Sequence, residues 1–403
     1  MRRSLLLERV SIQGFKNIAR LNLSFTHDSE LPGRWTCIAG INGAGKSAVL
    51  QGIALVLLGT QRAPDLRSGL LQRLRRRVNG HTEDALLQAT VYHGAELRTL
   101  ELKLGAQGID QAEAVSAPAY KQMKEVWDER EQSHVLVAYG PGRNLSERIK
   151  TDYQDLHVDV QRQITLFDPL ADVASAEALL DHRERRGPFL GLLKRLLALV
   201  LKDTPLSIAP DRDGLRFRMN GVSVPASDLP DGFRAVVAWL ADLCAAWCEK
   251  APDEARDGDP TRIRAIVLID EIDLHLHPSL QRVLVPRLRR ALPDVQWIVT
   301  THSPLVLSSF DRRELVLLDA QSEGGVRTLD RQILGWSMDE VYSWLMETEP
   351  RSGALDERPI DEDLALVLAQ SPEVSERKAR ENQELRRKLI ERLKKRDAEK
   401  GEP

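Results

Sequence analysis

The sequence predicts an α/β protein with a mostly parallel core sheet and a helical C-terminal extension. Three observations carry this prediction. Two near-continuous apolar runs, at 264–270 and 295–302, are typical of strands buried at the centre of a parallel sheet. The segment 34–40 is a short apolar strand that leads through glycines directly into a helix. After about Arg331 the composition shifts, and the last 33 residues carry 11 Lys and Arg against 8 Asp and Glu.

The composition is that of a chain able to bury a sizeable core. Of its 403 residues, 42% are hydrophobic and 29% are charged. The 57 Lys and Arg against 60 Asp and Glu exclude a wholly cationic coat for nucleic acid, so any basic surface must be local. The three cysteines show neither a disulfide framework nor a paired zinc spacing. No apolar run approaches the roughly 18 residues of a membrane span, and Glu8 and Arg9 interrupt the apolar start too early for a secretory signal. We therefore expect a cytoplasmic protein.

The first part of the chain is expected to consist mainly of strands. Apolar and polar residues alternate on both sides of Gly14, from 6 to 25, which predicts two half-buried strands joined by a turn. From Lys46 to Leu57, apolar residues recur at helical spacing. The further elements expected here are strands at 85–93, 97–104 and 135–140, and a helix around 120–131.

An insertion of helix and short strands is expected at about 146–228. Its Leu-rich stretch at 175–202 reads as helical, with a break at 183–188 (RERRGP). Asp213 and Gly214 supply a hairpin turn within a small strand cluster. The strands of this cluster and the helix that follows are expected at 206–210, 215–219, 222–226 and 232–248.

A complete phosphate-binding motif follows the strand at 34–40. Such a loop turns consecutive backbone N–H groups toward phosphate oxygens, and the start of the next helix adds a favourable dipole. Lys46 is expected to reach the β and γ phosphates of ATP, and the Ser47 hydroxyl is expected to bind Mg²⁺. The residues of the motif are Gly40, Ile41, Asn42, Gly43, Ala44, Gly45, Lys46 and Ser47.

An acidic pair ends the apolar strand at 264–270. Asp270 is placed to make the second protein contact to Mg²⁺, through water, and Glu271 is placed to act as general base on the attacking water. An acidic pair after a strand is weak evidence alone, and the phosphate loop makes it strong.

Histidines follow both core strands. His302 comes at the carboxyl end of the second strand, where ligands of parallel sheets bind, and could hydrogen-bond the γ-phosphate. His275 and His277 invite a zinc site with Asp273, but a spacing of two without a cysteine partner is poor for one.

The order of these motifs resembles ABC-type ATPases of the RecF/SMC/OLD-like group. More narrowly, it is similar to the stand-alone prokaryotic ATPases related to the Septu defence protein PtuA and to predicted ATP-binding proteins involved in virulence. The resemblance spans about Leu6 to Leu318 and rests on GFKNI, GINGAGKS, VAYGPGR, AIVLIDEIDLHLHP and VTTHSP.

The resemblance implies a fold and a partner. The fold is a P-loop NTPase head of the ABC type at 1–330, with a mostly parallel core sheet, an antiparallel β subdomain, a helical lobe and a helical extension at 331–403. Two copies would sandwich two ATP molecules as a homodimeric clamp, acting in anti-phage defence with a separate effector such as a nuclease.

The family's signature loop departs from its usual pattern here. Leu229-Pro230-Asp231-Gly232 matches it, but proline replaces the serine that would donate to the γ-phosphate across the dimer. Asp231 and the Gly232 backbone N–H remain as expected nucleotide contacts.

Two further nucleotide contacts are implied by the resemblance. The family places a glutamine in a loop near the nucleotide, and Gln161 and Gln163 are both candidates. Lys16 falls where related heads place a basic residue near the nucleotide, although an exposed lysine at a strand end explains it equally well.

Other functions stay open from the sequence. One alternative is a RecF-like ATPase of DNA repair, and another is a nucleotide-gated scaffold with little turnover. The basic segments at 67–77 and in the tail make nucleic acid a possible partner. Leu385, Leu389 and Leu393 form an apolar stripe that favours docking of the tail to a protein partner or to the ATPase body. We find neither a long coiled coil nor a nuclease centre in the sequence.

Overall fold

A computed structural model gives the structure of the chain over most of its first 327 residues. It describes residues 5–26, 32–66, 68–109, 126, 135–143, 153, 155–173, 183–202, 204, 206–211, 214–319 and 322–327. The expected extension at 331–403, with its leucine stripe, lies outside the described residues. So does the expected helix at 120–131, apart from Val126.

The core is a six-stranded sheet in the order β16-β15-β3-β14-β13-β9, among the described residues. All its strands pair in parallel except β16, which is antiparallel to β15 at one edge. The predicted mostly parallel core is therefore confirmed. The bounds are β3 Trp35–Ala39, β9 Val135–Tyr139, β13 Ala265–Ile269, β14 Val295–Thr300, β15 Leu315–Leu318 and β16 Val326–Arg327.

A second, antiparallel sheet forms the expected β subdomain, in the order β2-β1-β6-β7-β8. The turn between its first two strands lies at Lys16 and Asn17 rather than at Gly14, because Phe15 pairs with Ile18 and Lys16 adopts a left-handed φ of 48°. The bounds are β1 Leu5–Phe15, β2 Ile18–Ser24, β6 Ala85–His93, β7 Glu96–Gly105 and β8 Gly108–Ile109, with a two-stranded ribbon of β4 Arg77–Val78 and β5 His81–Thr82 beside them.

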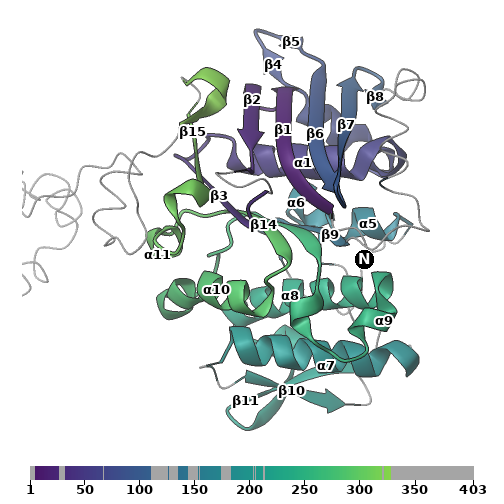
Figure 1. The fold of residues 1–403 in the computed structure, drawn as a ribbon, viewed down its shortest axis with the longest axis vertical. Coiled ribbons are helices and arrows are strands. Elements are labelled where there is room, and N and C mark those ends of the chain that lie inside the picture. The colour runs from purple at the N-terminus through teal and green to yellow at the C-terminus, as the bar shows by residue number, and fades with distance from the viewer. Residues whose placement is uncertain are drawn as a thin grey trace, which may run out of the picture. The chain divides into compact units, whose positions relative to one another are not determined.

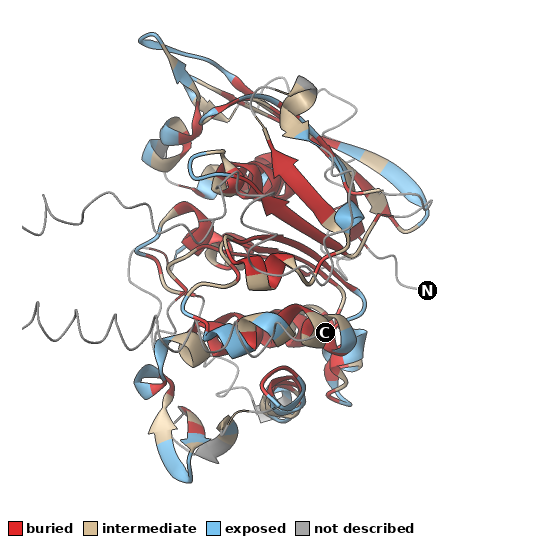
Figure 2. Cartoon of the chain, turned by 90° about the vertical axis from the view of Figure 1, so that its left-hand side faces the viewer, coloured by how far each residue is buried: buried red, intermediate tan, exposed pale blue. Residues whose placement is uncertain are grey.

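Helix α1 (Lys46–Arg62) lies between the two sheets and is buried along most of its length (Figures 1 and 2). Its apolar residues pack against the antiparallel sheet on one side and against one face of the core sheet on the other. The buried Gln296 of β14 accepts from the backbone N–H of Leu7 at 2.7 Å and donates to its carbonyl at 2.8 Å. This side chain satisfies both polar groups of one residue of β1, and so ties the two sheets together.

The other face of the core sheet is covered by helices, with α8 (Asp231–Lys250) and α10 (Pro278–Ala291) next to the sheet and α7 (Arg183–Val200) beyond them (Figure 1). Trp297 of β14 stacks on Trp35 at 5.1 Å and meets Trp239 of α8 edge-on at 5.9 Å. These large rings fill the space between sheet and helices.

The expected break at 183–188 is wrong, because α7 begins at Arg183 and continues through Pro188. Proline beyond the first turn of a helix removes one backbone hydrogen bond and clashes with the carbonyl four residues earlier, so the sequence alone favours a break here. The packing of Phe189, Leu192, Leu193 and Leu196 in the core supports the helix beyond it.

The small strand cluster of the insertion is confirmed as a three-stranded antiparallel sheet, β10-β11-β12. Asp211 pairs with Gly214, so Gly214 begins the second strand, and the rest of the expected turn, at 213, lies outside the described residues. The bounds of these strands and of the short helices are β10 Leu206–Asp211, β11 Gly214–Met219, β12 Val222–Pro225, α2 Ser68–Leu74, α5 Val158–Gln161, α6 Ile164–Phe167, α9 Pro252–Ala255 and α11 Pro304–Leu307. Among the described helices, none is both long and apolar enough to cross a membrane.

Candidate functional site

Four adjacent parallel strands bring the predicted site residues to one edge of the core sheet. In the order β3-β14-β13-β9, their carboxyl ends lead into the phosphate loop, His302, Asp270 and a Gly-Pro-Gly-Arg turn. Segments far apart in the sequence therefore meet where parallel sheets bind ligands.

The phosphate loop has the backbone that its glycines predict. Gly43 and Gly45 adopt φ of 80° and 100°, which other residues rarely adopt, and an added Cβ at Gly43 would meet no atom within 4 Å. Lys46, only 7% exposed, donates from Nζ to the carbonyls of Gly40 at 2.9 Å and Ile41 at 3.0 Å. Burial lowers the pKa of Lys46, and the charges of the acidic pair oppose that shift. The buried ammonium and the open glycine loop fit a chain of phosphates.

Asn17, which is not part of the phosphate-binding motif, holds this loop. Asn17 donates from Nδ2 to the carbonyl of Gly43 at 2.7 Å. A Cβ at Gly45 would lie 3.0 Å from the same amide, so a larger residue there would crowd Asn17, and the φ of 100° favours glycine. The only sequence signal was the GFKNI motif, which contains Asn17 but does not reveal its contact.

Lys16, the residue before Asn17 in the turn between β1 and β2, contacts α1. Its Nζ donates to Oε1 of Gln51 at 2.7 Å, and Gln51 donates in turn to the carbonyl of Leu166 at 2.7 Å. Burial lowers the pKa of Lys16, and the charge of Asp270 opposes this. Lys16 is thus half-buried and near the acidic pair, rather than an ordinary exposed lysine at a strand end.

The acidic pair is held by β14. Thr300 donates from Oγ1 to Oδ1 of Asp270 at 2.5 Å and accepts from the backbone N–H of Glu271 at 2.7 Å. Asp270 is 3% exposed, whereas Glu271 is half-buried and adopts a left-handed φ of 50°. The backbone therefore turns sharply between the two acids, so that one is fixed in the sheet edge and the other leaves it. Asp273 is held in the same way, by the Thr301 hydroxyl.

Arg143, which follows β9, reaches the acidic pair from the neighbouring strand. It is 3% exposed, and its Nη2 donates to the backbone carbonyl of Glu271 at 2.6 Å. Burial lowers the pKa of Arg143 to about 10, against the opposing charges of Asp270, Asp273 and Glu271. The guanidinium therefore stays charged at neutral pH.

The remaining predicted residues of this edge are a serine of α1 and the histidines that follow β13 and β14. Ser47 is half-buried in the first turn of α1, and His302 is half-buried two residues after β14. His277 caps the N-terminus of α10, where its Nδ1 accepts from the backbone N–H of Ser279 at 3.3 Å. In the part of the chain that the structure describes, no group of His, Cys, Asp and Glu has the arrangement of a metal cluster.

The signature loop begins α8. Pro230 is its exposed N-cap and makes no capping bond, and Asp231 accepts from Arg234 at 2.6 Å. A Cβ at Gly232 would lie 2.5 Å from the carbonyl oxygen of His275. The glycine is therefore required within this chain, because the loop after the acidic pair packs directly on its backbone.

Both candidate glutamines lie in the α5–α6 segment. Gln161 donates to the carbonyl of Leu156 at 2.7 Å, and the fully buried Gln163 donates to that of Asp159 at 3.1 Å. These bonds are made within the segment, so a role of either glutamine toward a nucleotide stays a prediction.

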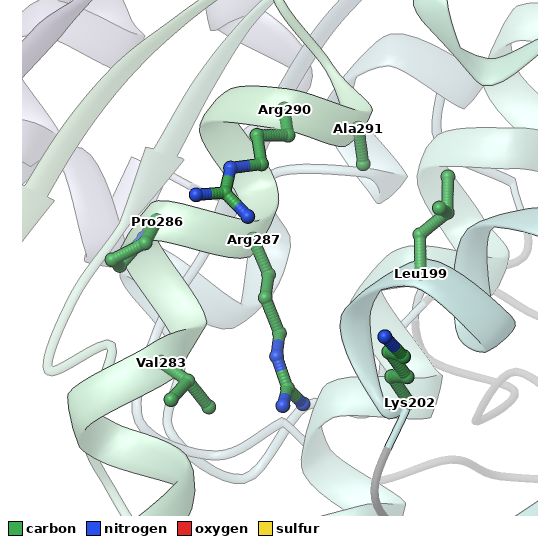
Figure 3. Close-up of a pocket in the computed structure, with 7 residues that line it drawn as sticks. All are labelled: Leu199, Lys202, Val283, Pro286, Arg287, Arg290 and Ala291. Carbon is green, nitrogen blue, oxygen red and sulfur yellow. The ribbon is translucent and has the colours of Figure 1, made fainter.

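Another hollow of the surface contains none of the predicted site residues. A cavity of about 490 Å³ between α7 and α10 is lined by apolar side chains and by Lys202, Arg287 and Arg290 (Figure 3). Arg287 donates to the carbonyl of Val200 at 3.0 Å, at the C-terminus of α7, and Arg290 lies in the last turn of α10. Cations at the carbonyl ends of two helices stabilise the helix dipoles, which explains their gathering here without a ligand.

Comparison with known proteins gives sequence relatives and a related fold. The family described as "AAA domain, putative AbiEii toxin, Type IV TA system" matches residues 155–308. Septu protein PtuA of Bacillus mycoides is 26% identical over 316 residues, which is 77% of this chain and 40% of that protein. Retron Ec83 probable ATPase of Escherichia coli is 34% identical over 145 residues, or 36% of this chain and 25% of that protein. The chain thus spans at most 40% of the length of these two relatives.

The fold has a counterpart among solved structures. The Smc head domain of Pyrococcus furiosus, solved with an extended coiled coil and bound to the C-terminal domain of ScpA, superposes with a TM-score of 0.50 at 12% identity, covering 85% of this chain and 99% of that one. This confirms the predicted head-type α/β fold over the described residues. In sequence the chain is thus similar to Septu protein PtuA and to a retron probable ATPase over part of their length, and its fold is that of an Smc head domain.

Proposed function

We propose that this chain binds ATP with Mg²⁺ and hydrolyses it. The observation that carries the proposal is the meeting of a complete phosphate loop with an acidic pair at one sheet edge. Lys46 and the carboxylates of Asp270 and Glu271 are close enough for each charge to act on the other. Such an arrangement is suited to a polyphosphate and its counter-ion, because the lysine and the backbone N–H groups face anionic oxygens while the carboxylates face a cation.

Each residue has a distinct task in this proposal. The loop from Gly40 to Gly45 cradles phosphate oxygens, and Lys46 neutralises those of the β and γ phosphates. Ser47 and Asp270 hold Mg²⁺, which would supply charge neutralisation on the phosphates. Glu271, half-buried in the turn after β13, accepts a proton from the attacking water. Lys16, in the turn between β1 and β2, and His302, which follows β14, contact the phosphates.

We further propose that the ATPase works as a homodimeric clamp in prokaryotic defence. The Septu and retron names of the sequence relatives support the setting. In the dimer, Asp231 and Gly232 of one copy would complete the nucleotide site of the other, and a separate effector such as a nuclease would respond to closure. A nucleotide-gated scaffold with little turnover is the second candidate, because Pro230 offers no hydroxyl at the start of α8.

The decisive experiment compares Lys46→Ala with the unchanged chain. Without the ammonium, affinity for Mg-ATP should fall below detection by calorimetry, and phosphate release should stop. Lys194→Ala, at an exposed position of α7, is the matched control and should bind as the unchanged chain does. ATP binding by Lys46→Ala within a few-fold of the control would refute the assignment of this loop.

A further inference from the structure

Arg143 lies at a point where the topology connects it to the acidic pair. β9 pairs in parallel with β13, with Tyr139 opposite Ile269, so Arg143 and Asp270 emerge from neighbouring strands at the same edge. The nearby glycines are needed for this turn, because a Cβ at Gly142 would lie 2.1 Å from the carbonyl oxygen of Pro169. The turn is therefore packed, and it delivers the guanidinium to the site in a fixed direction.

The guanidinium is only partly satisfied by the protein. Nη2 donates to the Glu271 carbonyl, but Nε and Nη1 are buried and have no hydrogen-bond partner among the described residues. Leaving buried charged donors unpaired costs considerable free energy. Arg162, which is also buried, shows the usual solution, because it binds the carboxylates of both Asp242 and Glu249.

Arg143 and Lys46 act on the same two carboxylates from opposite sides. The charges of Asp270 and Glu271 influence the pKa of Arg143 as well as that of Lys46. In the strand order β3-β14-β13-β9, Lys46 follows β3 and Arg143 follows β9, so the two cations flank the acidic pair that follows β13. In a nucleoside triphosphate, the terminal phosphate is the part that extends farthest past the loop.

We propose that Arg143 is a positioning residue that couples the terminal phosphate of ATP to the backbone of Glu271. Its Nε and Nη1 groups receive a phosphate oxygen, while Nη2 holds the Glu271 carbonyl. Because the guanidinium is a rigid plane, a phosphate bound at Nε and Nη1 also fixes the orientation of Nη2, which donates to the Glu271 carbonyl. Arg143 would then lie where the resemblance implies a glutamine near the nucleotide, for which Gln161 and Gln163 are the candidates. This inference rests on the proposed function, since it requires a triphosphate at the phosphate loop.

The test measures binding of ATP and of ADP, each with Mg²⁺, to the full chain and to Arg143→Lys and Arg143→Gln. ADP reaches Lys46 but has no terminal phosphate for Arg143, so its affinity should change less than about two-fold. ATP affinity should fall by about 10-fold to 100-fold, as expected for one lost hydrogen bond between charged groups. The ratio of the two affinities is the readout, because a general loss of structure lowers both.

Arg289→Lys is the matched control. Arg289 binds Glu314 through two bonds of 2.6 Å and stacks on Trp35, so its replacement should lower the melting temperature and leave the ATP to ADP ratio unchanged. An unchanged ratio in both Arg143 variants would overturn the proposal while leaving ATP binding intact. Loss of ADP binding in both variants would also overturn it, since the guanidinium would then belong to the scaffold. Failure of the unchanged chain to bind ATP would instead overturn the proposed function.

Discussion

At the scale of single residues, Glu271 has a backbone held by hydrogen bonds and a side chain that takes no part in them. Its N–H is held by Thr300 and its carbonyl by Arg143, so both fixed contacts belong to the main chain. The side chain is free to meet water. A change confined to the carboxylate therefore tests chemistry without disturbing the turn.

We predict that Glu271→Gln keeps ATP binding and slows hydrolysis by about 10²-fold or more, which is the usual contribution of a general base. The amide has the same size and leaves both backbone bonds in place, but it cannot accept the proton. Phosphate release and calorimetric affinity should be measured side by side, with Glu96→Gln on the exposed edge of β7 as control. Unchanged hydrolysis would remove Glu271 from the role of base.

The site residues that belong to a sequence motif could be predicted from the sequence, whereas the residues that hold them in place could not. Lys46, Asp270 and Glu271 are visible because their chemistry depends on near neighbours in the chain. Asn17, Thr300 and Arg143 act through contacts 26, 29 and 128 residues away. Such contacts follow from strand order and register, which a single sequence does not specify.

At the scale of elements, the sequence predicted the core strands best. The strands β3, β13 and β14 are near-continuous apolar runs, since both of their faces are covered, and such runs have few alternative structures. Boundaries set by tertiary contacts were harder to predict. The turn lies at Lys16 and not at Gly14, which is part of β1. Glycine is needed at position 14 for another reason, because an added Cβ would lie 2.4 Å from the carbonyl oxygen of Asp84. Pro188 marked a break that packing overrides.

The joint between α8 and the loop after β13 gives a prediction at this scale. Gly232→Ala would bring a Cβ to 2.5 Å from the His275 carbonyl oxygen, and neither partner is a flexible side chain. We expect a loss of about 1–3 kcal/mol in unfolding free energy, as for other overpacked sites. Denaturant titration measures this.

Gly191→Ala is the control for that experiment. Gly191 also lies in a helix, α7, but an added Cβ there has no neighbour within 4 Å. Alanine should stabilise this helix by roughly 0.5–1 kcal/mol. If both substitutions had the same effect, the contact between Gly232 and the loop would not be a constraint on the fold.

At the scale of the whole molecule, the open question is how two copies meet. The phosphate loop and the acidic pair lie within one chain, whereas the proposed sandwich dimer adds the loop that begins α8. This loop has Pro230 where the family's pattern has serine. The described structure makes this position accessible, because Pro230 is exposed and caps α8 without a side-chain bond.

We predict that Pro230→Ser tightens ATP-driven self-association by about 10-fold to 100-fold, the value of one hydrogen bond to a charged group. The measurement is sedimentation velocity with Mg-ATP, in a Glu271→Gln background that keeps the nucleotide intact. Serine is also a good N-cap, so a gain could come from α8 alone. Pro230→Asp separates the two effects, because aspartate caps a helix equally well but repels a phosphate. Under the sandwich hypothesis, serine strengthens the ATP-dependent dimer and aspartate weakens it. Equal behaviour of the two variants would mean that this loop does not face a nucleotide of the partner subunit, and that the dimer, if it forms, uses another surface.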